Sequence, residues 1–277
     1  MSTQHWKIDD LPWDQFDPAL VDPNLIPIVK AAALVEYNAS DYATYLCNVF
    51  ADDPVFCQAA QEWAIEETQH GEALGLWAEK ADPSFDFKTA FARYTTGYRI
   101  NVEASASIRG SKSGELVARC VVETGTSSYY AALGNAVREP VLKKICRHIA
   151  ADEVHHYKMF YAFLEPQLKR EKLSRVQRLK IALGRVAESE DDELSFAYFA
   201  ANAPADAVYD RSTYTKAYQS RAYALYQTDH AEHIVTLVSR ACGFKLSGKW
   251  RKPLGFIARH LIRASARRAE SANRKAA

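Results

Sequence analysis

The amino-acid sequence predicts an all-α protein in which a four-helix bundle is followed by additional C-terminal helices. Apolar residues recur with the helical period over most of the 277 residues, and no stretch alternates convincingly between apolar and polar residues as a strand would. The chain also contains an internal repeat of one helical hairpin. Two such hairpins stack naturally into a bundle with short links inside each pair.

Eight helices are expected, and Pro, Gly and Asp residues mark the breaks between most of them. The seventh of them, 204–242, could be interrupted. The expected ranges are 24–50, 54–80, 87–109, 114–137, 139–169, 173–188, 204–242 and 252–272. At the level of organisation, the sequence predicts an N-terminal extended arm (1–23), a helical domain (24–242) and a basic amphipathic C-terminal helix or tail (243–277).

Composition and charge argue against several classes of protein. The formal net charge is +1, so no positive field is available to collect phosphates and nucleic acid is not an expected partner. No run of eighteen apolar residues predicts a transmembrane segment, and the first residues lack a secretory signal, so we expect a cytoplasmic protein. The five cysteines occur singly, as reduced thiols do: Cys47, Cys57, Cys120, Cys146 and Cys242. A rubredoxin-type iron module needs four cysteine ligands and cannot be built here, so electrons would come from an external donor.

The internal repeat carries the chemistry. Each of the blocks 24–80 and 114–169 has a lone Glu in its first helix and a Glu-x-x-His in its second. The first block places Glu36 31 residues before Glu67, and the second places Glu123 30 residues before Glu153. Matched spacing of this kind predicts that the two hairpins present equivalent acids to a common centre.

Each of the four glutamates is expected to face inward. Positions three, four and seven residues from Glu36 and Glu153 are almost all small or apolar. Those around Glu123 include more polar residues but are still typical of a buried helix face. Around Glu67 the same face consists of Ala60, Trp63, Ala64, His70, Gly71 and Leu74.

Four buried carboxylates need cations close to them, because each bare charge costs several kcal/mol in lost hydration. Glu and His at i and i+3 lie on the same side of a helix, so each Glu-x-x-His offers two donors to one metal. The sequence therefore predicts a di-metal centre with one imidazole per metal, and its oxygen and nitrogen donors suit iron, or manganese, better than structural zinc. The expected ligands are Glu36, Glu67, His70, Glu123, Glu153 and His156.

The last helix allows a second register. Asp152 and His155 are also spaced i, i+3 and could replace Glu153 and His156 as ligands. We favour Glu153 and His156 because their helix face is more apolar. In that register Asp152 is expected to orient a ligand imidazole from outside the ligand set.

Three segments resemble the soluble acyl-acyl-carrier-protein desaturases, which belong to the ferritin-like di-iron carboxylate superfamily. The segment EWAIEETQHGEAL, from Glu62 to Leu74, resembles that family's E-E-x-x-H-G-[DE]-x-L helix. The segment ICRHIAADEVHH, from Ile145 to His156, is similar to its I-C-x-x-I-A-A-D-E-x-x-H helix. ETGT, starting at Glu123, matches its third ligand helix. The resemblance covers about 25–170.

The resemblance implies a ferritin-like bundle whose di-iron centre is held by the same six residues and uses O2 as co-substrate. It also implies desaturation of a fatty-acyl or other apolar substrate, with an electron donor such as ferredoxin and an acyl carrier protein as partners; we further expect a homodimer. Thr126 would place its hydroxyl near the oxygen-binding face and is the one catalytic candidate. The alternative for Thr126 is a helix-interior threonine bonded back to a carbonyl.

Other functions share this arrangement of ligands. A di-iron hydroxylase or oxygenase acting on a small molecule would show nearly the same spacings. An arylamine N-oxygenase typically has an additional histidine where this chain has Ile149. A ferritin-like ferroxidase would be a shorter chain, and a binding protein with a relic site would not consume O2.

The C-terminal segment suggests a docking helix. Leu254, Ile257, Leu261 and Ala264 form an apolar stripe accompanied by arginines at 259, 263, 267 and 268. The sequence is compatible with docking to an acidic acyl carrier protein, with contact to an anionic membrane, and with a solvated terminal helix.

Overall fold

The computed structural model describes residues 6–188 and 192–276. Within these ranges all regular structure is helical and no β-strand occurs, which confirms the predicted all-α class. The helices are α1 (Ile26–Tyr37), α2 (Ala39–Val49), α3 (Pro54–Ala81), α4 (Phe87–Gly97), α5 (Lys112–Ala136), α6 (Pro140–Glu171), α7 (Arg175–Glu188), α8 (Asp192–Asn202), α9 (Arg211–Ala222), α10 (Thr228–Ala241) and α11 (Gly248–Ala276).

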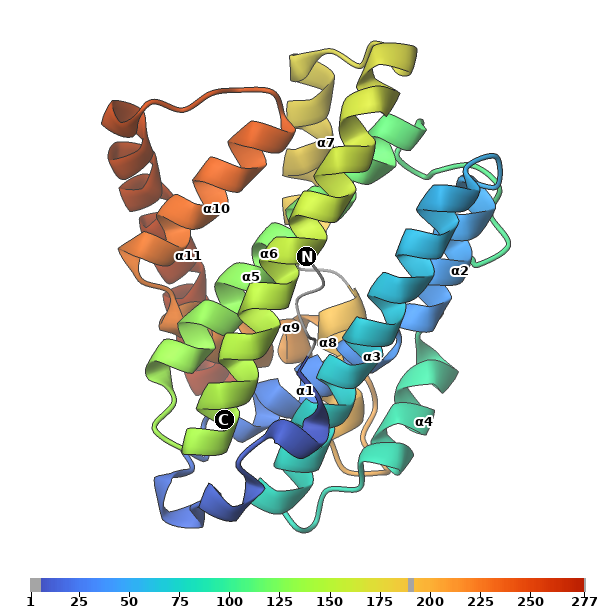
Figure 1. Cartoon of the computed structure of the whole chain (residues 1–277). Helices are drawn as coiled ribbons and strands as arrows, with labels where there is room; N and C mark the ends of the chain where they lie inside the picture. Colours follow the sequence, from blue (N-terminus) through green and yellow to red (C-terminus); the bar gives the residue numbers. More distant parts are fainter. Residues whose placement is uncertain (1–5, 189–191, 277) are drawn as a thin grey trace.

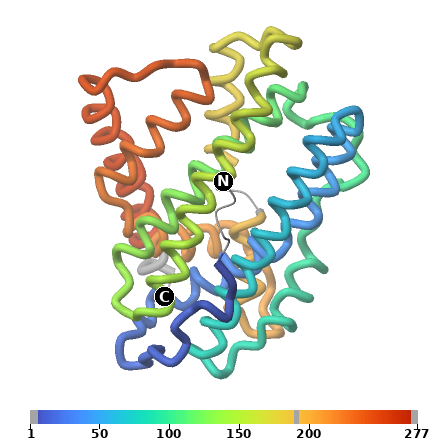
Figure 2. Tube along the Cα trace, viewed as in Figure 1, coloured from blue at the N-terminus to red at the C-terminus, as the bar shows by residue number. Residues whose placement is uncertain are grey.

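Two helical hairpins form the centre of the molecule (Figure 1). In one, α1 and α2 pack along α3; in the other, α5 packs along α6, and the two hairpins meet through α3 and α6. The remaining helices surround them: α8 lies on α1, α7 and α10 lie on α5, and α11 packs on α9 and α10. The trace in Figure 2 shows α10 and α11 on the side of the α5–α6 hairpin that faces away from α3.

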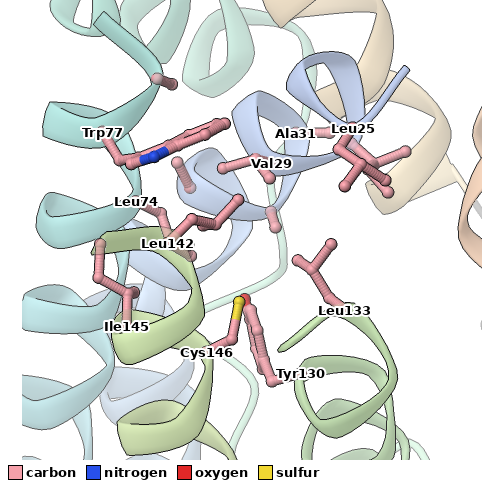
Figure 3. Close-up of a cluster of buried hydrophobic side chains, with 14 of the residues drawn as sticks. Leu25, Val29, Ala31, Leu74, Trp77, Tyr130, Leu133, Leu142, Ile145 and Cys146 are labelled. Carbon is pink, nitrogen blue, oxygen red and sulfur yellow. The ribbon is translucent and has the colours of Figure 1, made fainter. Parts of the chain in front are cut away.

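The core joins both hairpins. Figure 3 shows side chains of α1, α3, α5 and α6 packed together, among them Leu25, Val29, Ala31, Leu74, Trp77, Tyr130, Leu133, Leu142, Ile145 and Cys146. The α3–α6 contact continues along the helices through aromatic pairs, with the rings of Trp63 and Phe160 at 5.7 Å and those of Phe56 and Phe163 at 5.1 Å. Burial of this apolar surface fixes the relative position of the helices that carry the predicted ligands.

The first predicted helix, 24–50, is divided in two. Asn38 has φ −84° and ψ 8°, and its N–H turns back to the carbonyls of Val35 and Glu36, so α1 ends directly after the first predicted ligand. At this point α1 lies against the backbone of α3. A Cβ added to Gly71 would be 2.5 Å from the backbone nitrogen of Tyr37, so only glycine permits the approach.

Other predicted boundaries differ from those of the structure. The expected helix 87–109 stops at Gly97, where a Cβ would lie 2.0 Å from the ring of Phe196, and 98–111 is irregular. The interruption left open in 204–242 is present, because this segment consists of α9, a 3-10 turn and α10; α8 was not predicted. The last helix begins at Gly248 rather than at 252, because the carbonyl of Ser247 accepts from the N–H groups of Trp250 and Arg251.

The described part of the N-terminal arm lies on the helical body. The predicted extended arm contains three short 3-10 turns, and it buries Trp6 and Leu11. Residues 1–5 of the predicted arm lie outside the described residues. None of the helices in the described ranges combines the length and apolar character that crossing a lipid bilayer requires.

Candidate metal centre

The six predicted ligands converge at one buried point between the hairpins. Glu36 comes from α1, Glu67 and His70 from α3, Glu123 from α5, and Glu153 and His156 from α6. All six side chains are buried; the most exposed, Glu36, retains 7% of its surface and Glu153 retains none. His155, the alternative in the second register, is exposed, so the structure places Glu153 and His156 inside instead.

The six residues form two overlapping groups. The first consists of Glu36, Glu67, His70 and Glu153, and the second of Glu67, Glu123, Glu153 and His156. Within each group one donor atom per residue lies within 4.8 Å of all the others. Two donors on opposite sides of one ion, at bonds of about 2.2 Å, would be about 4.4 Å apart, so each group is compact enough to surround a metal. Glu67 and Glu153 belong to both groups and can bridge two ions.

Both imidazoles turn the same nitrogen toward the centre. His70 Nδ1 lies 3.1 Å from Glu67 Oε2 and 3.4 Å from Glu153 Oε1. His156 Nδ1 lies 3.1 Å from Glu67 Oε1 and 3.6 Å from Glu153 Oε2. Each Glu-x-x-His therefore brings its nitrogen and a carboxylate oxygen to the same place, as the i, i+3 spacing predicts.

The outer nitrogens are held by acids from the opposite hairpin. His70 Nε2 lies 3.1 Å from Asp152 Oδ2, and His156 Nε2 lies 2.8 Å from Glu66 Oε2. A carboxylate on the outer nitrogen fixes the orientation of a ligand imidazole and keeps the inner nitrogen available. Asp152 was expected in this position; Glu66 was missed, although it precedes Glu67 as Asp152 precedes Glu153.

The N-terminal arm closes one side of the centre. The indole N–H of Trp6 donates to Asp152 Oδ2 at 2.7 Å, and its ring is parallel to that of His70 at a centroid distance of 6.0 Å. The carbonyl of Trp6 accepts from the Gln69 side chain at 3.0 Å. The arm thus holds Asp152 from the outside.

Two hydroxyl groups reach the carboxylates. Thr126 Oγ1 donates to Glu153 Oε2 at 2.8 Å and also lies 3.3 Å from the carbonyl of Val122, the contact expected of a helix-interior threonine. Tyr130, which is buried, donates its phenol proton to Glu36 Oε1 at 2.5 Å. No local feature of the sequence links Tyr130 to Glu36, which lies 94 residues away.

The four carboxyl groups fall into two pairs, one with raised and one with lowered pKa values. Burial, followed by the charge of Glu67, raises the pKa of Glu36 well above its ordinary value. Burial, followed by the charge of Glu153, does the same to the pKa of Glu123. Burial also opposes ionisation of Glu67 and Glu153, but their hydrogen bonds and the neighbouring imidazoles outweigh it and lower both pKa values.

The imidazoles show the opposite response. Burial lowers the pKa of His70, but hydrogen bonds to Asp152 and Glu153 outweigh it and raise the pKa well above its ordinary value. Burial likewise opposes the charge on His156, and the carboxylate of Glu67 more than compensates, so this pKa is also raised. In the metal-free protein, protonated imidazoles compensate the negative charge of the carboxylates. A bound metal ion would supply this positive charge instead.

Several of the oxygen and nitrogen atoms that could bind a metal lack a hydrogen bond of good geometry. Among the described residues, both carboxylate oxygens of Glu123, Oε1 of Glu153 and Nδ1 of His156 are buried, and their contacts with neighbouring charged groups lack the geometry of a full hydrogen bond. Buried polar atoms are normally paired, and each such exception calls for an explanation. Since these atoms all point into the centre, the two Glu/His groups fit, and could hold, metal ions.

Two larger cavities lie elsewhere on the protein. A groove of about 910 Å³ runs between α2 and α3 along residues such as Ala43, Cys47 and Ile65, and a polar cavity of about 320 Å³ adjoins Tyr42 and Arg119. Neither is lined by any of the six residues.

Comparison with known proteins gives no independent assignment. Neither a scan against protein-family models nor a search of curated proteins found a match to this chain.

Proposed function

We propose that this protein is an O2-dependent di-iron oxidoreductase of the ferritin-like kind, and that it most resembles the acyl-acyl-carrier-protein desaturases in its chemistry. The observation that carries the proposal is the sharing of Glu67 and Glu153 by two compact Glu/His groups. One imidazole and one unshared carboxylate per group complete the donor set of di-iron carboxylate proteins. Oxygen and nitrogen donors of this mixture suit iron and leave manganese as the second choice.

The side chains of the centre would bind and orient the two ions. Glu36 and Glu123 would each serve one ion, Glu67 and Glu153 would bridge, and His70 and His156 would coordinate through Nδ1. When bound, reduced iron would supply the electrons that activate O2 for attack on an unactivated C–H bond. Thr126 would hold a proton at Oγ1, 2.8 Å from Glu153.

The surroundings favour an apolar substrate. Large side chains of the ligand helices themselves, Trp63 on α3 and Tyr157 and Phe160 on α6, are buried and would exclude water from the centre. We propose a fatty-acyl or comparably apolar substrate, with electrons delivered by an external donor such as ferredoxin, because all five cysteines of this chain are free thiols.

Metal analysis tests the ligand set. Iron-loaded protein is expected to contain about two irons per chain and to show the absorption of an oxo-bridged di-ferric pair. Glu153→Ala and His70→Ala should each abolish the band. His155→Ala, at an exposed position on the same helix as Glu153, should leave it unchanged. Persistence of the band in both ligand variants contradicts the assignment.

Product analysis tests the reaction. The reduced protein is mixed with O2, an electron donor and acyl-acyl-carrier-protein thioesters of several chain lengths, and the products are examined by mass spectrometry. Loss of two hydrogens supports desaturation, and gain of one oxygen identifies a hydroxylase. Oxidation of ferrous iron without any change in substrate indicates a ferroxidase, and absence of O2 consumption excludes an oxidase of any kind.

A further inference from the structure

The C-terminal segment gives the chain a strong charge asymmetry. Residues 245–277 contain ten Lys or Arg and one acidic residue, Glu270, whereas the whole chain contains 35 basic and 34 acidic residues. The rest of the chain therefore has 25 basic and 33 acidic residues, a net charge of −8 against +9 for the segment. A protein that is nearly neutral overall concentrates its positive charge at one end of its sequence.

The segment forms α11, which is attached to the body along one face. Ala266 and Ala269 are buried, and Gly255 lies against α10 so closely that a Cβ there would be 3.0 Å from Cα of Glu232. Arg251 forms an ion pair with Glu232 at 3.3 Å at the edge of this contact. Small residues thus define the face of α11 that packs on the protein.

A line of large apolar side chains lies on the exposed part of α11. Trp250, Ile257 and Leu261 are 65%, 53% and 68% exposed. Ile257 and Leu261 follow Trp250 by 7 and 11 residues, about two and three helical turns, so the three side chains share one line. Phe256, 54% exposed, lies beside them. The stripe expected from the sequence is therefore only partly retained, because Leu254 is half-buried and Trp250 joins Ile257 and Leu261.

Exposed cations accompany this line. Lys249 and Arg267 lie about 100° to one side of the line, and Arg268 continues it beyond Leu261. Lys252 lies on the opposite side of the helix. Aromatic and aliphatic side chains on one face, with lysine and arginine beside them, are typical of helices that lie in the interface of a membrane. Long basic side chains can then reach the phosphate groups while their stems remain in apolar surroundings.

We propose that α11 binds the surface of an anionic lipid bilayer, with Trp250, Ile257 and Leu261 inserted among the lipids. The cations favour an acidic partner, which could be a lipid surface or an acidic protein. The exposed apolar line beside them favours the lipid surface, because such side chains can insert among lipid chains. The helix lies on the bilayer and does not cross it. This inference is independent of the metal centre and would stand if the proposed oxidation were disproved.

Vesicle sedimentation with the full-length protein tests the proposal. The protein is expected to sediment with phosphatidylcholine vesicles that contain a quarter phosphatidylglycerol, to remain in solution with pure phosphatidylcholine, and to dissociate as salt is added. Ile257→Ser/Leu261→Ser should lower vesicle binding at least tenfold. Val55→Ser/Ile108→Ser changes two residues that are 68% and 75% exposed on other parts of the chain and should bind like the wild type.

A second variant keeps the apolar line and changes only charge. Lys249→Glu/Arg267→Glu should also lose binding to the anionic vesicles, and circular dichroism establishes that each variant is folded. Failure of the wild type to sediment, or equal binding by all variants, overturns the proposal. Binding of purified acyl carrier protein, or self-association, that depends on Ile257 and Leu261 while vesicles are not bound would assign the face to a protein partner and also overturn it.

Discussion

His70 on α3 and Asp152 on α6 connect the two hairpins at the candidate metal centre, with 3.1 Å between Nε2 and Oδ2. The reciprocal contact, between His156 on α6 and Glu66 on α3, is 2.8 Å. Each hairpin therefore supplies the acid that orients the other hairpin's imidazole. Both hairpins share an Acid-Glu-x-x-His sequence, and the packing of α3 against α6 brings each acid to the other hairpin's histidine.

Removing either outer acid should weaken metal binding. Asp152→Asn and Glu66→Gln preserve size but remove the charge that holds the imidazole, and each is expected to lower the affinity for ferrous iron by about 10–100-fold. Competition with a chelating dye measures the change. Glu62→Gln, at an exposed position of α3, is the control. Equal affinity in all three variants would show that the outer acids do not support the ligands.

Gly71 should be intolerant of a side chain. Gly71→Ala places a Cβ 2.5–2.7 Å from the backbone and Cβ of Tyr37, and the resulting displacement of α1 should cost about 1–3 kcal/mol of unfolding free energy. Gly125→Ala is the matched control, because a Cβ there meets nothing within 4 Å and alanine favours the helix by up to about 1 kcal/mol. Urea denaturation compares the two, and a Gly71→Ala protein as stable as the wild type would contradict the close approach.

The phenol of Tyr130 should stabilise the protein through Glu36. Tyr130→Phe removes the 2.5 Å hydrogen bond to a buried carboxyl group and is expected to cost about 1–3 kcal/mol. Tyr129→Phe removes a 3.5 Å contact with the carbonyl of Ile28 and a hydrogen bond with Tyr218, neither of them to a carboxyl group, and should cost less. Denaturation of the metal-free proteins gives both values. The prediction fails if the two substitutions have the same effect.

Metal binding should release protons and strengthen as pH rises. The raised pKa values of Glu36, Glu123, His70 and His156 mean that these groups keep their protons to higher pH than usual in the metal-free protein. A metal must displace those protons, so acid favours the metal-free form and the apparent affinity should increase from about pH 6 to about pH 8. Calorimetry in buffers of different ionisation enthalpy measures the protons released. Binding without proton release would show that these groups are already deprotonated.

Local sequence information was sufficient for part of the site. The inward direction of Glu67 and Glu153, and the pairing of each with a histidine one turn later, depend only on helical geometry. The choice between Glu153 and Asp152 likewise followed from the apolar face of one helix. By contrast, the sequence did not reveal the break at Asn38, the end of α4 at Gly97 or the close approaches of Gly71 to Tyr37 and of Gly97 to Phe196, which join residues of different helices.

The sequence by itself determined the helical class, the two hairpins and the identity of the acids and imidazoles that lie inside them, because these follow from periodicities within single helices. Only the tertiary structure decided which atoms meet: the partnership of Glu66 with His156, the bond from Tyr130 to Glu36, and the side of α11 that remains exposed. These contacts join residues far apart in the chain. Their geometry is set by how the helices pack, and no single helix carries that information.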